Sequence, residues 1–212
     1  RLRHLREAEE KKSMARILDL AEQVLRKHEV LASDFLDPYH AGLAHDILVG
    51  IPDIKFIFQG GYQDAERKRI ILFPHYLQPE DVESQIQILK ITGSGPFEAL
   101  SHRDFLGAVL GLGLKREKVG DILVAQESAF VMVAAELAQY VALNLSQVGR
   151  VPVTVQFLAE GDLEHEYQEN FKLIRATVAS LRLDAVGGHG FNLSRTKMAQ
   201  EIKAGKVKLN WM

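Results

Sequence analysis

The order of strand-like and helix-like segments between residues 86 and 157 restricts the fold more than any other feature of the sequence. Runs of apolar and β-branched residues predict four strands, at 86–91, 121–124, 129–133 and 151–157. Two helices are expected between them, at 101–112, where Ser101 and Asp104 have the spacing of a capping box, and at 134–145. The order is β-α-β-β-α-β, the split βαβ or ferredoxin-like arrangement of RRM domains. We therefore predict an α+β protein with an RRM-like middle domain at residues 79–160.

One face of this predicted sheet is expected to be open. The two helices cover a single face, and RRM domains stack bases on aromatic side chains of the other face. Phe130 is the only aromatic residue in the third predicted strand, and the full RNP pattern of RRM domains is absent. Base stacking on the open face is therefore not favoured.

Residues 1–78 predict a small α/β domain in front of the middle domain. Apolar residues repeat at intervals of three and four between residues 5 and 28, as expected of an amphipathic helix. Asp37 and Pro38 are suited to an N-cap and a first helical turn, and they predict a second helix that ends near Val49. Strand-like runs at 55–58 and 69–73 flank Gly60-Gly61-Tyr62 and predict a hairpin.

The balance of charge changes after the middle domain. Residues 160–170 contain five acids and predict a linker, which we place at 161–170. Residues 171–212 then carry eight Lys and Arg against two acids, a net charge of +6. The whole chain has 26 Lys and Arg and 28 acids, so the remainder carries −8. A basic module on an acidic body is expected of a protein that holds a polyanion at one end.

The basic module predicts two short helices followed by a strand. Residues 181–186 form a helical turn that the glycines at 187, 188 and 190 are expected to stop. The second helix begins after Ser194 as its N-cap and ends at Gly205, and residues 206–211 alternate as a half-buried strand does. Arg195 and Lys197 lie in the first turn, where the helix macrodipole disfavours cations. The pattern fits a phosphate site at this helix end, although a solvated basic face gives the same pattern.

Several classes of site have no support in the residue types present. The chain has no cysteine, which excludes disulfides, thiolate catalysis and cysteine-ligated metals. The eight histidines form no His-x-x-His pair, and Ser101, His102 and Asp104 share one helix start, unlike a hydrolase triad. We therefore expect no enzymatic activity, metal, cofactor or small-molecule substrate. No apolar run approaches the ~18 residues of a membrane helix, so we expect no membrane partner.

The hairpin loop GGYQDAERKR, at residues 60–69, is a second candidate for phosphate binding. It places three cations directly after a glycine turn, and its backbone N–H groups could cradle an anion. Taken alone, a tight hairpin with solvated charges is the simpler interpretation.

The stretches SLRLDAV and GFNLSRTKMAQEIKAGKVKLNW resemble the RNA-binding domain of ribosomal protein S-four, also called the alpha-L motif. In that family, two helices and the strand that follows form the RNA face. By this resemblance the RNA-binding candidates are Arg182, Ser194, Arg195, Lys197, Lys203, Lys206, Lys208 and Asn210. The family continues with a further strand, so we expect the alpha-L domain of residues 171–212 to be incomplete.

Four stretches together resemble the YlmH family, whose relatives include the photosystem II S-four-domain proteins. They are GGYQDAERKR, LSHRDFLGAVLGLGLKREKVGDILV, LNLSQVGRVPV and the alpha-L segment, in this order. The resemblance implies a cytoplasmic protein, or a plastid stroma protein in a plant, that binds rRNA and tRNA on the large ribosomal subunit and acts in rescue of stalled translation. It also implies secondary RNA contacts at Arg67, Lys68, Arg69, His102, Arg103, Lys115, Arg116 and Lys118.

Two other functions remain open. The chain could be an adaptor in cell division or photosystem assembly, with vestigial RNA binding. It could also be a degenerate RNA-modifying protein, because alpha-L domains are appended to pseudouridine synthases. Those enzymes need a catalytic Asp in a separate, larger domain, and no segment here fills that role. The sequence therefore favours a non-enzymatic RNA-binding protein.

Overall fold

The computed structural model describes residues 8–94, 97, 100–167, 173–207 and 209. The chain divides into two compact units, which we call the N-terminal unit (Arg1–Gln168) and the C-terminal unit (Glu169–Met212). The described residues contain two antiparallel sheets and seven α-helices. No helix among them has the length and apolar character needed to cross a membrane.

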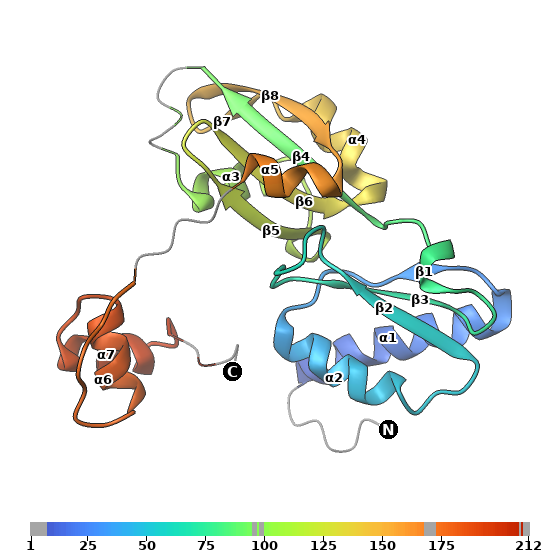
Figure 1. Cartoon of the computed structure of the whole chain (residues 1–212), viewed down its shortest axis with the longest axis horizontal. Coiled ribbons are helices and arrows are strands. Elements are labelled where there is room, and N and C mark those ends of the chain that lie inside the picture. Colours follow the sequence, from blue (N-terminus) through green and yellow to red (C-terminus); the bar gives the residue numbers. More distant parts are fainter. Residues whose placement is uncertain (1–7, 95–96, 98–99, 168–172, 208, 210–212) are drawn as a thin grey trace. The chain divides into compact units, whose positions relative to one another are not determined.

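The N-terminal unit begins with a three-stranded sheet and two helices (Figure 1). In chain order its elements are α1 (Ala8–Lys27), β1 (Leu31–Ala32), α2 (Pro38–Leu48), β2 (Ile54–Gln59) and β3 (Arg69–Pro74). The strand order is β1-β3-β2, all antiparallel. The predicted start of α2 is confirmed, because the Asp37 side chain accepts a hydrogen bond from the His40 backbone N–H at 2.8 Å. The predicted hairpin of β2 and β3 is also confirmed, while β1 was not predicted.

The helices α1 and α2 bury their apolar faces on this first sheet. Buried residues of α1 recur at positions 14, 17, 21 and 24, a helical period that puts them on one face. They pack in one cluster with Ile47 of α2 and with Ile70 and Leu72 of β3. Apart from Glu10, which is buried and accepts a hydrogen bond from the Tyr39 hydroxyl, the charged residues of α1 from Lys11 to Lys27 are exposed, as expected of an amphipathic helix.

The second part of the N-terminal unit is a five-stranded antiparallel sheet. It follows the short 3-10 helix η1 (Pro79–Asp81), and its elements are β4 (Ile86–Gly93), α3 (His102–Gly111), the 3-10 helix η3 (Arg116–Lys118), β5 (Val119–Val124), β6 (Ser128–Ala134), α4 (Ala135–Asn144), β7 (Gln147–Val148) and β8 (Val151–Leu158). The strand order is β5-β6-β4-β8-β7. The predicted order of strands and helices is confirmed apart from the added β7. The Ser101–Asp104 capping box is present as well.

The helices α3 and α4 cover one face of the five-stranded sheet. Phe105 and Val109 of α3 and Val141 of α4 pack on Leu89 and Val131 of the sheet, and all five side chains are fully buried. This is the largest apolar cluster of the described residues, and it holds the middle part of the chain together.

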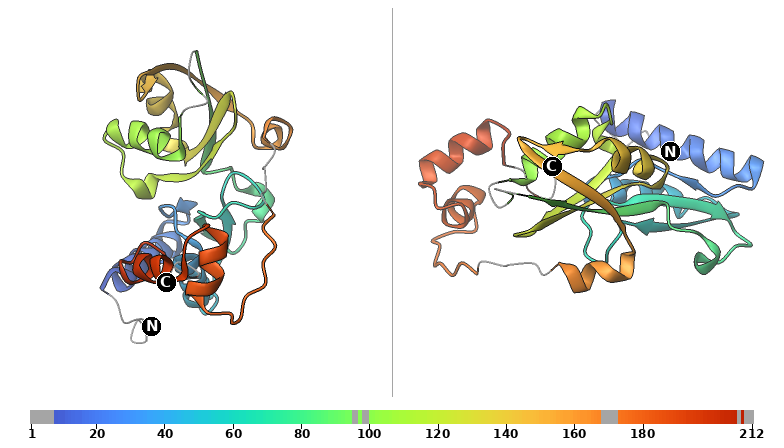
Figure 2. Two further views of the ribbon diagram at one scale, coloured as in Figure 1. Left: turned by 90° about the vertical axis from the view of Figure 1, so that its left-hand side faces the viewer. Right: turned by 90° about the horizontal axis from the view of Figure 1, so that it is seen from above.

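The opposite face of this sheet is covered over β4 and β6, so the expectation of an open face is wrong there, while Thr154 and Gln156 of β8 stay exposed on it. A 3-10 helix η4 (Glu160–Asp162) and helix α5 (Leu163–Glu166) lie across it, on the side away from α3 and α4 (Figure 2). Leu163 is buried there, and the Tyr167 ring lies 6.0 Å from the ring of Phe130, which is fully buried. Phe35 packs in the same cluster. Base stacking on Phe130 has no room in this arrangement.

The segment expected to be an acidic linker therefore begins as part of the N-terminal unit. Glu166 forms an ion pair with Lys90 of β4, and Leu163 supplies the apolar contact. Residues 168–170 lie outside the described part of the chain. The acidic composition suggested a linker. Leu163 and Tyr167 are nevertheless sufficient to hold this short helix on the sheet.

The C-terminal unit contains two helices, α6 (Leu183–Gly190) and α7 (Arg195–Lys203). Residues 187–190 continue α6, so the expectation that the glycines stop this helix is wrong. A Cβ atom on Gly187 would lie 3.2 Å from the Met198 sulfur, and one on Gly188 would lie 3.0 Å from the Leu193 carbonyl oxygen. Both distances are shorter than an ordinary contact, so glycine at these positions allows Met198 of α7 and the loop before it to pack closely on α6.

The end of α7 agrees with the sequence. Gly205 follows the helix with φ of +70°, the left-handed geometry that glycine adopts without strain. The strand expected at 206–211 is not formed at Val207 or Leu209, while Lys208, Asn210 and Trp211 lie outside the described residues.

Candidate nucleic-acid interface

The first turn of α7 combines two cations with a capped helix start. The Ser194 hydroxyl oxygen accepts a hydrogen bond from the Lys197 backbone N–H at 3.3 Å, which confirms Ser194 as the N-cap. Arg195 and Lys197 are exposed, and this turn contains no acid. Positive charge therefore accumulates at the end of the helix that already carries the positive pole of the macrodipole. Such an arrangement favours an incoming anion.

Asp184, in the first turn of α6, forms hydrogen bonds with two of the candidate arginines. Its carboxylate oxygens accept hydrogen bonds from Arg182 Nε at 3.0 Å and from Arg195 Nε at 2.9 Å. These hydrogen bonds, first that of Arg182 and then that of Arg195, lower the pKa of Asp184 to about 2. The carboxylate is therefore ionised at any physiological pH. Composition identifies Asp184 only as one of two acids in a basic module, and the spacing Arg182-Leu183-Asp184 is the sequence signal for its pairing.

The other candidates of the C-terminal unit lie toward the far end of α7 or beyond it. Lys203, in the last turn, is exposed, where its charge is favourable to the helix dipole. Lys206 pairs with Glu201 at 2.8 Å. Lys208 and Asn210 lie outside the described residues. Among the described candidates, Arg182, Ser194, Arg195 and Lys197 thus form one group near the two helix starts, which we call the basic cluster.

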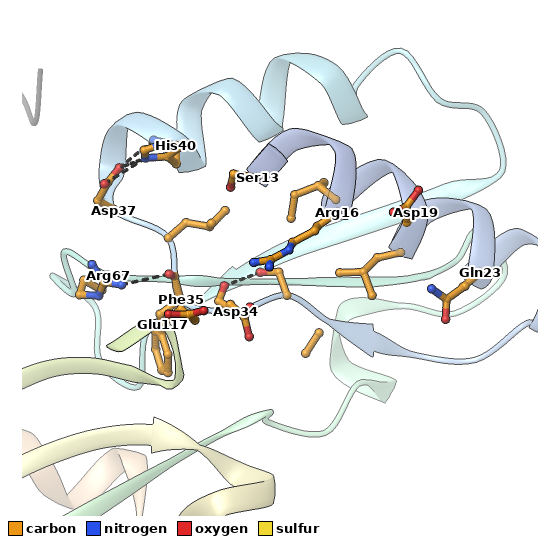
Figure 3. A pocket seen from close by; sticks show the side chains of 15 residues that line it. Ser13, Arg16, Asp19, Gln23, Asp34, Phe35, Asp37, His40, Arg67 and Glu117 are labelled. Atoms are coloured by element: carbon orange, nitrogen blue, oxygen red, sulfur yellow. Dashed lines mark hydrogen bonds and ion pairs between the residues drawn. The ribbon is translucent and has the colours of Figure 1, made fainter. Parts of the chain in front are cut away.

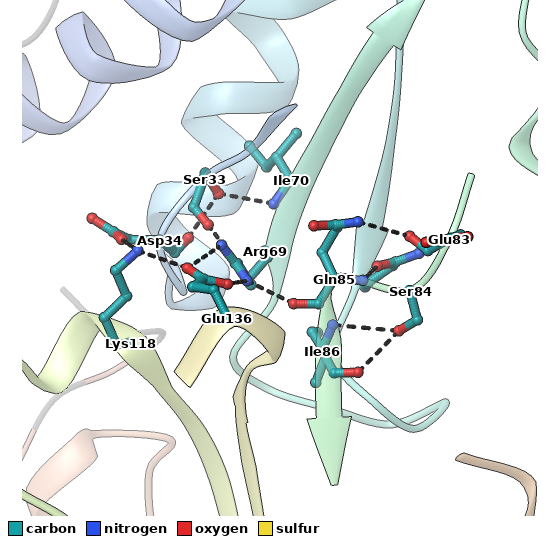
Figure 4. Close-up of polar contacts among 11 residues, drawn as sticks. Ser33, Asp34, Arg69, Ile70, Glu83, Ser84, Gln85, Ile86, Lys118 and Glu136 are labelled. Carbon is teal, nitrogen blue, oxygen red and sulfur yellow. Dashed lines mark hydrogen bonds and ion pairs between the residues drawn. The ribbon is translucent and has the colours of Figure 1, made fainter. Parts of the chain in front are cut away.

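Arg69, a candidate for secondary RNA contact, is buried inside the N-terminal unit (Figure 4). Its Nε donates to the Ser33 carbonyl oxygen at 2.6 Å, and its Nη1 donates to the Gln85 carbonyl oxygen at 2.6 Å. Both Nη atoms also reach the Glu136 carboxylate, at 3.0 and 3.2 Å. Since its side chain is only 3% exposed, Arg69 joins the two sheets of this unit and has no surface to offer a phosphate.

Lys118 extends the same network. It pairs with Asp34 at 2.9 Å and with Glu136 at 3.1 Å, so one lysine bridges the first sheet region and the start of α4. Burial alone would lower the pKa of Lys118, but the hydrogen bonds to Asp34 and Glu136 outweigh it and the pKa is raised. Lys118 is therefore half-buried, and its positive charge is balanced by the carboxylates of Asp34 and Glu136 instead of being free for RNA.

The hairpin loop at residues 60–69 binds an anion, but that anion is a side chain of the chain itself. The Asp121 carboxylate on β5 accepts hydrogen bonds from the Glu66 backbone N–H at 2.7 Å, the Arg67 backbone N–H at 3.1 Å and the Tyr62 hydroxyl at 3.0 Å. Gly60 has no room for a Cβ, which would lie 2.2 Å from Ala65 Cβ. The loop is thus tightly folded around Asp121.

We expect the substitution Asp121→Ala to lower the free energy of unfolding by about 1–3 kcal/mol, because two backbone N–H groups lose a charged acceptor. Urea unfolding followed by circular dichroism measures this change. The matched control is Asp64→Ala, which removes an exposed acid from the same loop and should change the free energy of unfolding by less than about 0.5 kcal/mol. Equal stability of the two variants would contradict the role given to Asp121.

The remaining secondary candidates divide by exposure. Arg67 donates from Nη2 to the Phe35 carbonyl oxygen at 3.1 Å, and Arg116 donates to the Val119 and Gly120 carbonyl oxygens. Burial lowers the pKa of both, that of Arg116 to about 10, and both stay charged at neutral pH. Lys68 is half-buried beside them. The candidates that remain exposed are His102, Arg103 and Lys115, which lie near the two ends of α3.

A cavity of about 460 Å³ lies between α1 and the loop at 32–37 (Figure 3). Its charged and titratable lining residues are Arg16, Asp19, Asp34, Asp37, His40, Arg67 and Glu117. Four of these are carboxylates, against two arginines and one histidine that is already bound to Asp37 at 2.9 Å. This excess of carboxylates disfavours a phosphate in the cavity.

Comparison with known proteins finds two family models that match consecutive parts of the N-terminal unit. The family model described as "YlmH, N-terminal" matches residues 9–77, and the one described as "Putative RNA-binding domain in YlmH" matches residues 79–161. A Bacillus subtilis protein named ribosome-associated protein quality control protein P2 is 37% identical over 188 residues, covering 89% of this chain and 72% of the relative. The solved cell division protein YlmH of Streptococcus pneumoniae matches with a TM-score of 0.62 at 25% identity, covering 74% of this chain and 95% of that one.

The fold and these matches place the chain in the class of modular proteins with mixed α/β architecture that carry an RNA-binding domain. The chain belongs to the YlmH family.

Proposed function

We propose that this protein is a non-enzymatic RNA-binding protein that associates with the ribosome and contacts rRNA or tRNA of the large subunit. Its role would be rescue or quality control of stalled translation in the cytoplasm. The relative from Bacillus subtilis is named as a ribosome-associated quality control protein, which supports this assignment. We further propose that residues 79–160 are an RRM-like domain and that residues 171–212 are an alpha-L domain.

The observation that carries the proposal is the basic cluster. Arg182 and Arg195 are brought together by Asp184, and Arg195 and Lys197 flank a helix start whose N–H groups attract anions. The side chains are exposed, so a phosphate can reach them. His102, Arg103 and Lys115, which are also exposed, are the secondary contacts that remain in the proposal.

The strand order of the five-stranded sheet supports the RRM-like assignment. The four predicted strands are β4, β5, β6 and β8 in chain order. Across the sheet they lie in the order β5-β6-β4-β8, and β7 is added at the edge next to β8. RNA binding would then use mainly loops and helix ends, because α3 and α4 cover one face of the sheet and η4 and α5 cover part of the other.

RNA affinity should fall steeply with salt concentration. Each phosphate contact releases counterions and contributes about −0.7 to −0.9 to the slope of log K against log salt. Three contacts, from Arg182, Arg195 and Lys197, predict a slope of about −2 to −3. Fluorescence anisotropy with labelled bulk tRNA, repeated across salt concentrations, gives the slope. A slope near zero would favour the alternative of an adaptor without RNA binding.

Sedimentation with purified large ribosomal subunits tests the ribosomal part of the proposal. The protein should migrate with the subunits in a sucrose gradient at low salt and separate from them as salt is raised. Failure to co-migrate, together with a steep tRNA slope, would keep the RNA-binding assignment and remove the ribosomal one.

A further inference from the structure

Asp184 occupies an unusual position for an acid in a module that is otherwise basic. Its side chain is 13% exposed, whereas the side chains of Arg182 and Arg195 that it contacts are 68% and 57% exposed. It is one of two acids among residues 171–212. The carboxylate thus lies beneath the two guanidinium groups, which extend outward from it.

The contacts made by Asp184 leave much of each guanidinium free. Arg195 uses its Nε atom, at 2.9 Å, and its Nη atoms are not used in this contact. Arg182 uses Nε at 3.0 Å and adds a long contact from Nη2 at 3.4 Å. A guanidinium presents five N–H donors in a planar fork that matches phosphate oxygens. The outward N–H groups of both arginines therefore remain available.

Two guanidinium groups held at one site repel each other, and a carboxylate hydrogen-bonded to both offsets that repulsion. Asp184 supplies that carboxylate from below and fixes Nε of each arginine. Long side chains lose conformational freedom when they bind, and a group already held in place loses less. The two arginines, one preceding α6 and one opening α7, are thereby ordered before any ligand arrives.

We propose that Asp184 is a positioning residue for phosphate recognition, which holds Arg182 and Arg195 as a paired clamp for the backbone of RNA. This inference rests on the proposed function and adds to it the residue that organises the site. Asp184 itself does not touch the ligand and acts through the arginines.

The proposal predicts that neutralising Asp184 changes RNA affinity in the direction opposite to the one that simple electrostatics predicts. Neutralising an acid in a basic surface should strengthen binding of a polyanion, since the local potential becomes more positive. If Asp184 positions the arginines, its neutralisation should weaken binding instead. The substitution Asp184→Asn keeps the size of the side chain and removes the charge, so it separates the two cases.

We expect Asp184→Asn to bind labelled bulk tRNA about tenfold more weakly than the parent chain, as the loss of one charge-assisted contact predicts. The slope of log K against log salt should become shallower by about 0.7 to 0.9, the contribution of roughly one phosphate contact. The matched control is Glu201→Gln, which removes the other acid of the module and only releases Lys206. This control should bind as tightly as the parent or more tightly.

A spectroscopic measurement shows whether the clamp itself has changed. In the full chain, the Nε–H signals of Arg182 and Arg195 should be slowed in solvent exchange by Asp184, and Asp184→Asn should remove this protection while the backbone amide spectrum of residues 173–207 is retained. If Asp184→Asn lost that amide spectrum, Asp184→Glu would decide. It keeps the charge but moves the carboxylate by one methylene, so weaker binding supports the proposal and unchanged binding contradicts it.

The possible outcomes separate the inference from the proposed function. If Arg195→Glu with Lys197→Glu abolishes binding while Asp184→Asn binds as tightly as the parent or more tightly, the positioning role is overturned and the RNA face stands. If charge reversal at Arg195 and Lys197 has no effect on binding, the RNA face itself is wrong.

Discussion

Replacing Arg69 with methionine is expected to lower the free energy of unfolding of the N-terminal unit by about 2–6 kcal/mol. Two backbone carbonyl oxygens, at Ser33 and Gln85, would lose a charged donor, and each such loss costs about 1–3 kcal/mol. Glu136 adds little to this cost, because its side chain is 48% exposed and keeps Lys118 as a partner. Urea unfolding followed by far-ultraviolet circular dichroism measures the change.

The control for this prediction is Arg103→Met. Arg103 is an exposed residue of the first turn of α3, so the same substitution there removes an arginine without leaving a buried acceptor. Its effect on the free energy of unfolding should be within about 0.5 kcal/mol. If both variants unfolded at the same urea concentration, Arg69 would not be the structural link between the two sheets.

The double substitution Arg195→Glu with Lys197→Glu should weaken RNA binding by at least about 30-fold. Each lost contact costs about 1–3 kcal/mol, so two contacts cost about 2–6 kcal/mol if they add. The fold should survive, because acids in the first turn of α7 are favoured by the helix dipole, which offsets part of the small cost of losing the Arg195–Asp184 ion pair at the surface. Anisotropy with labelled bulk tRNA gives the affinity, and the amide spectrum reports the fold.

The matched control reverses Lys11 and Lys12, two exposed lysines near the start of α1. It produces the same change in net charge near the start of another helix, so it removes the general electrostatic effect from the comparison. We expect the control to bind with nearly the affinity of the parent chain. Equal losses in the two double variants would show that net charge, and not the basic cluster, determines RNA affinity.

Local signals in the sequence were sufficient for most of the secondary structure. Asp37 before Pro38, the capping box at Ser101 and the N-cap at Ser194 all predicted helix starts that the structure contains. These motifs act within three or four residues, so no knowledge of the tertiary structure is needed to interpret them. The two-residue strands β1 and β7 were missed because each is defined only by its partner strand.

Features that depend on distant residues could not be predicted in the same way. Phe35 and Leu163 both pack on the face of the five-stranded sheet that was expected to be open, and they come from segments on either side of it in the sequence. Gly187 was interpreted by its conformational freedom, whereas its function is close contact with Met198. Periodicity reports which face of an element is apolar and does not report what covers that face.

At the candidate site, too, the sequence identifies the residue types but not the contacts that distant residues make with them. The family resemblance identified Arg67, Lys68 and Arg69 as one group of cations, but the structure gives them different environments. Arg69 is buried, while Arg67 and Lys68 are half-buried next to Asp121 and Leu36, respectively. A positive charge in the sequence therefore does not distinguish an RNA contact from an ion pair that joins two parts of the chain. Exposure and pairing decide between them.

The contact between Asp121 and the hairpin loop links anion binding to the joint between the two sheets. The backbone N–H groups of Glu66 and Arg67 can serve the carboxylate of Asp121 or an external anion, but not both at once. A free anion that entered this loop would compete with an internal ligand whose local concentration is fixed by the fold. The two backbone donors that made the loop a candidate for phosphate binding are thus already used to hold the first sheet's hairpin to β5 of the second sheet.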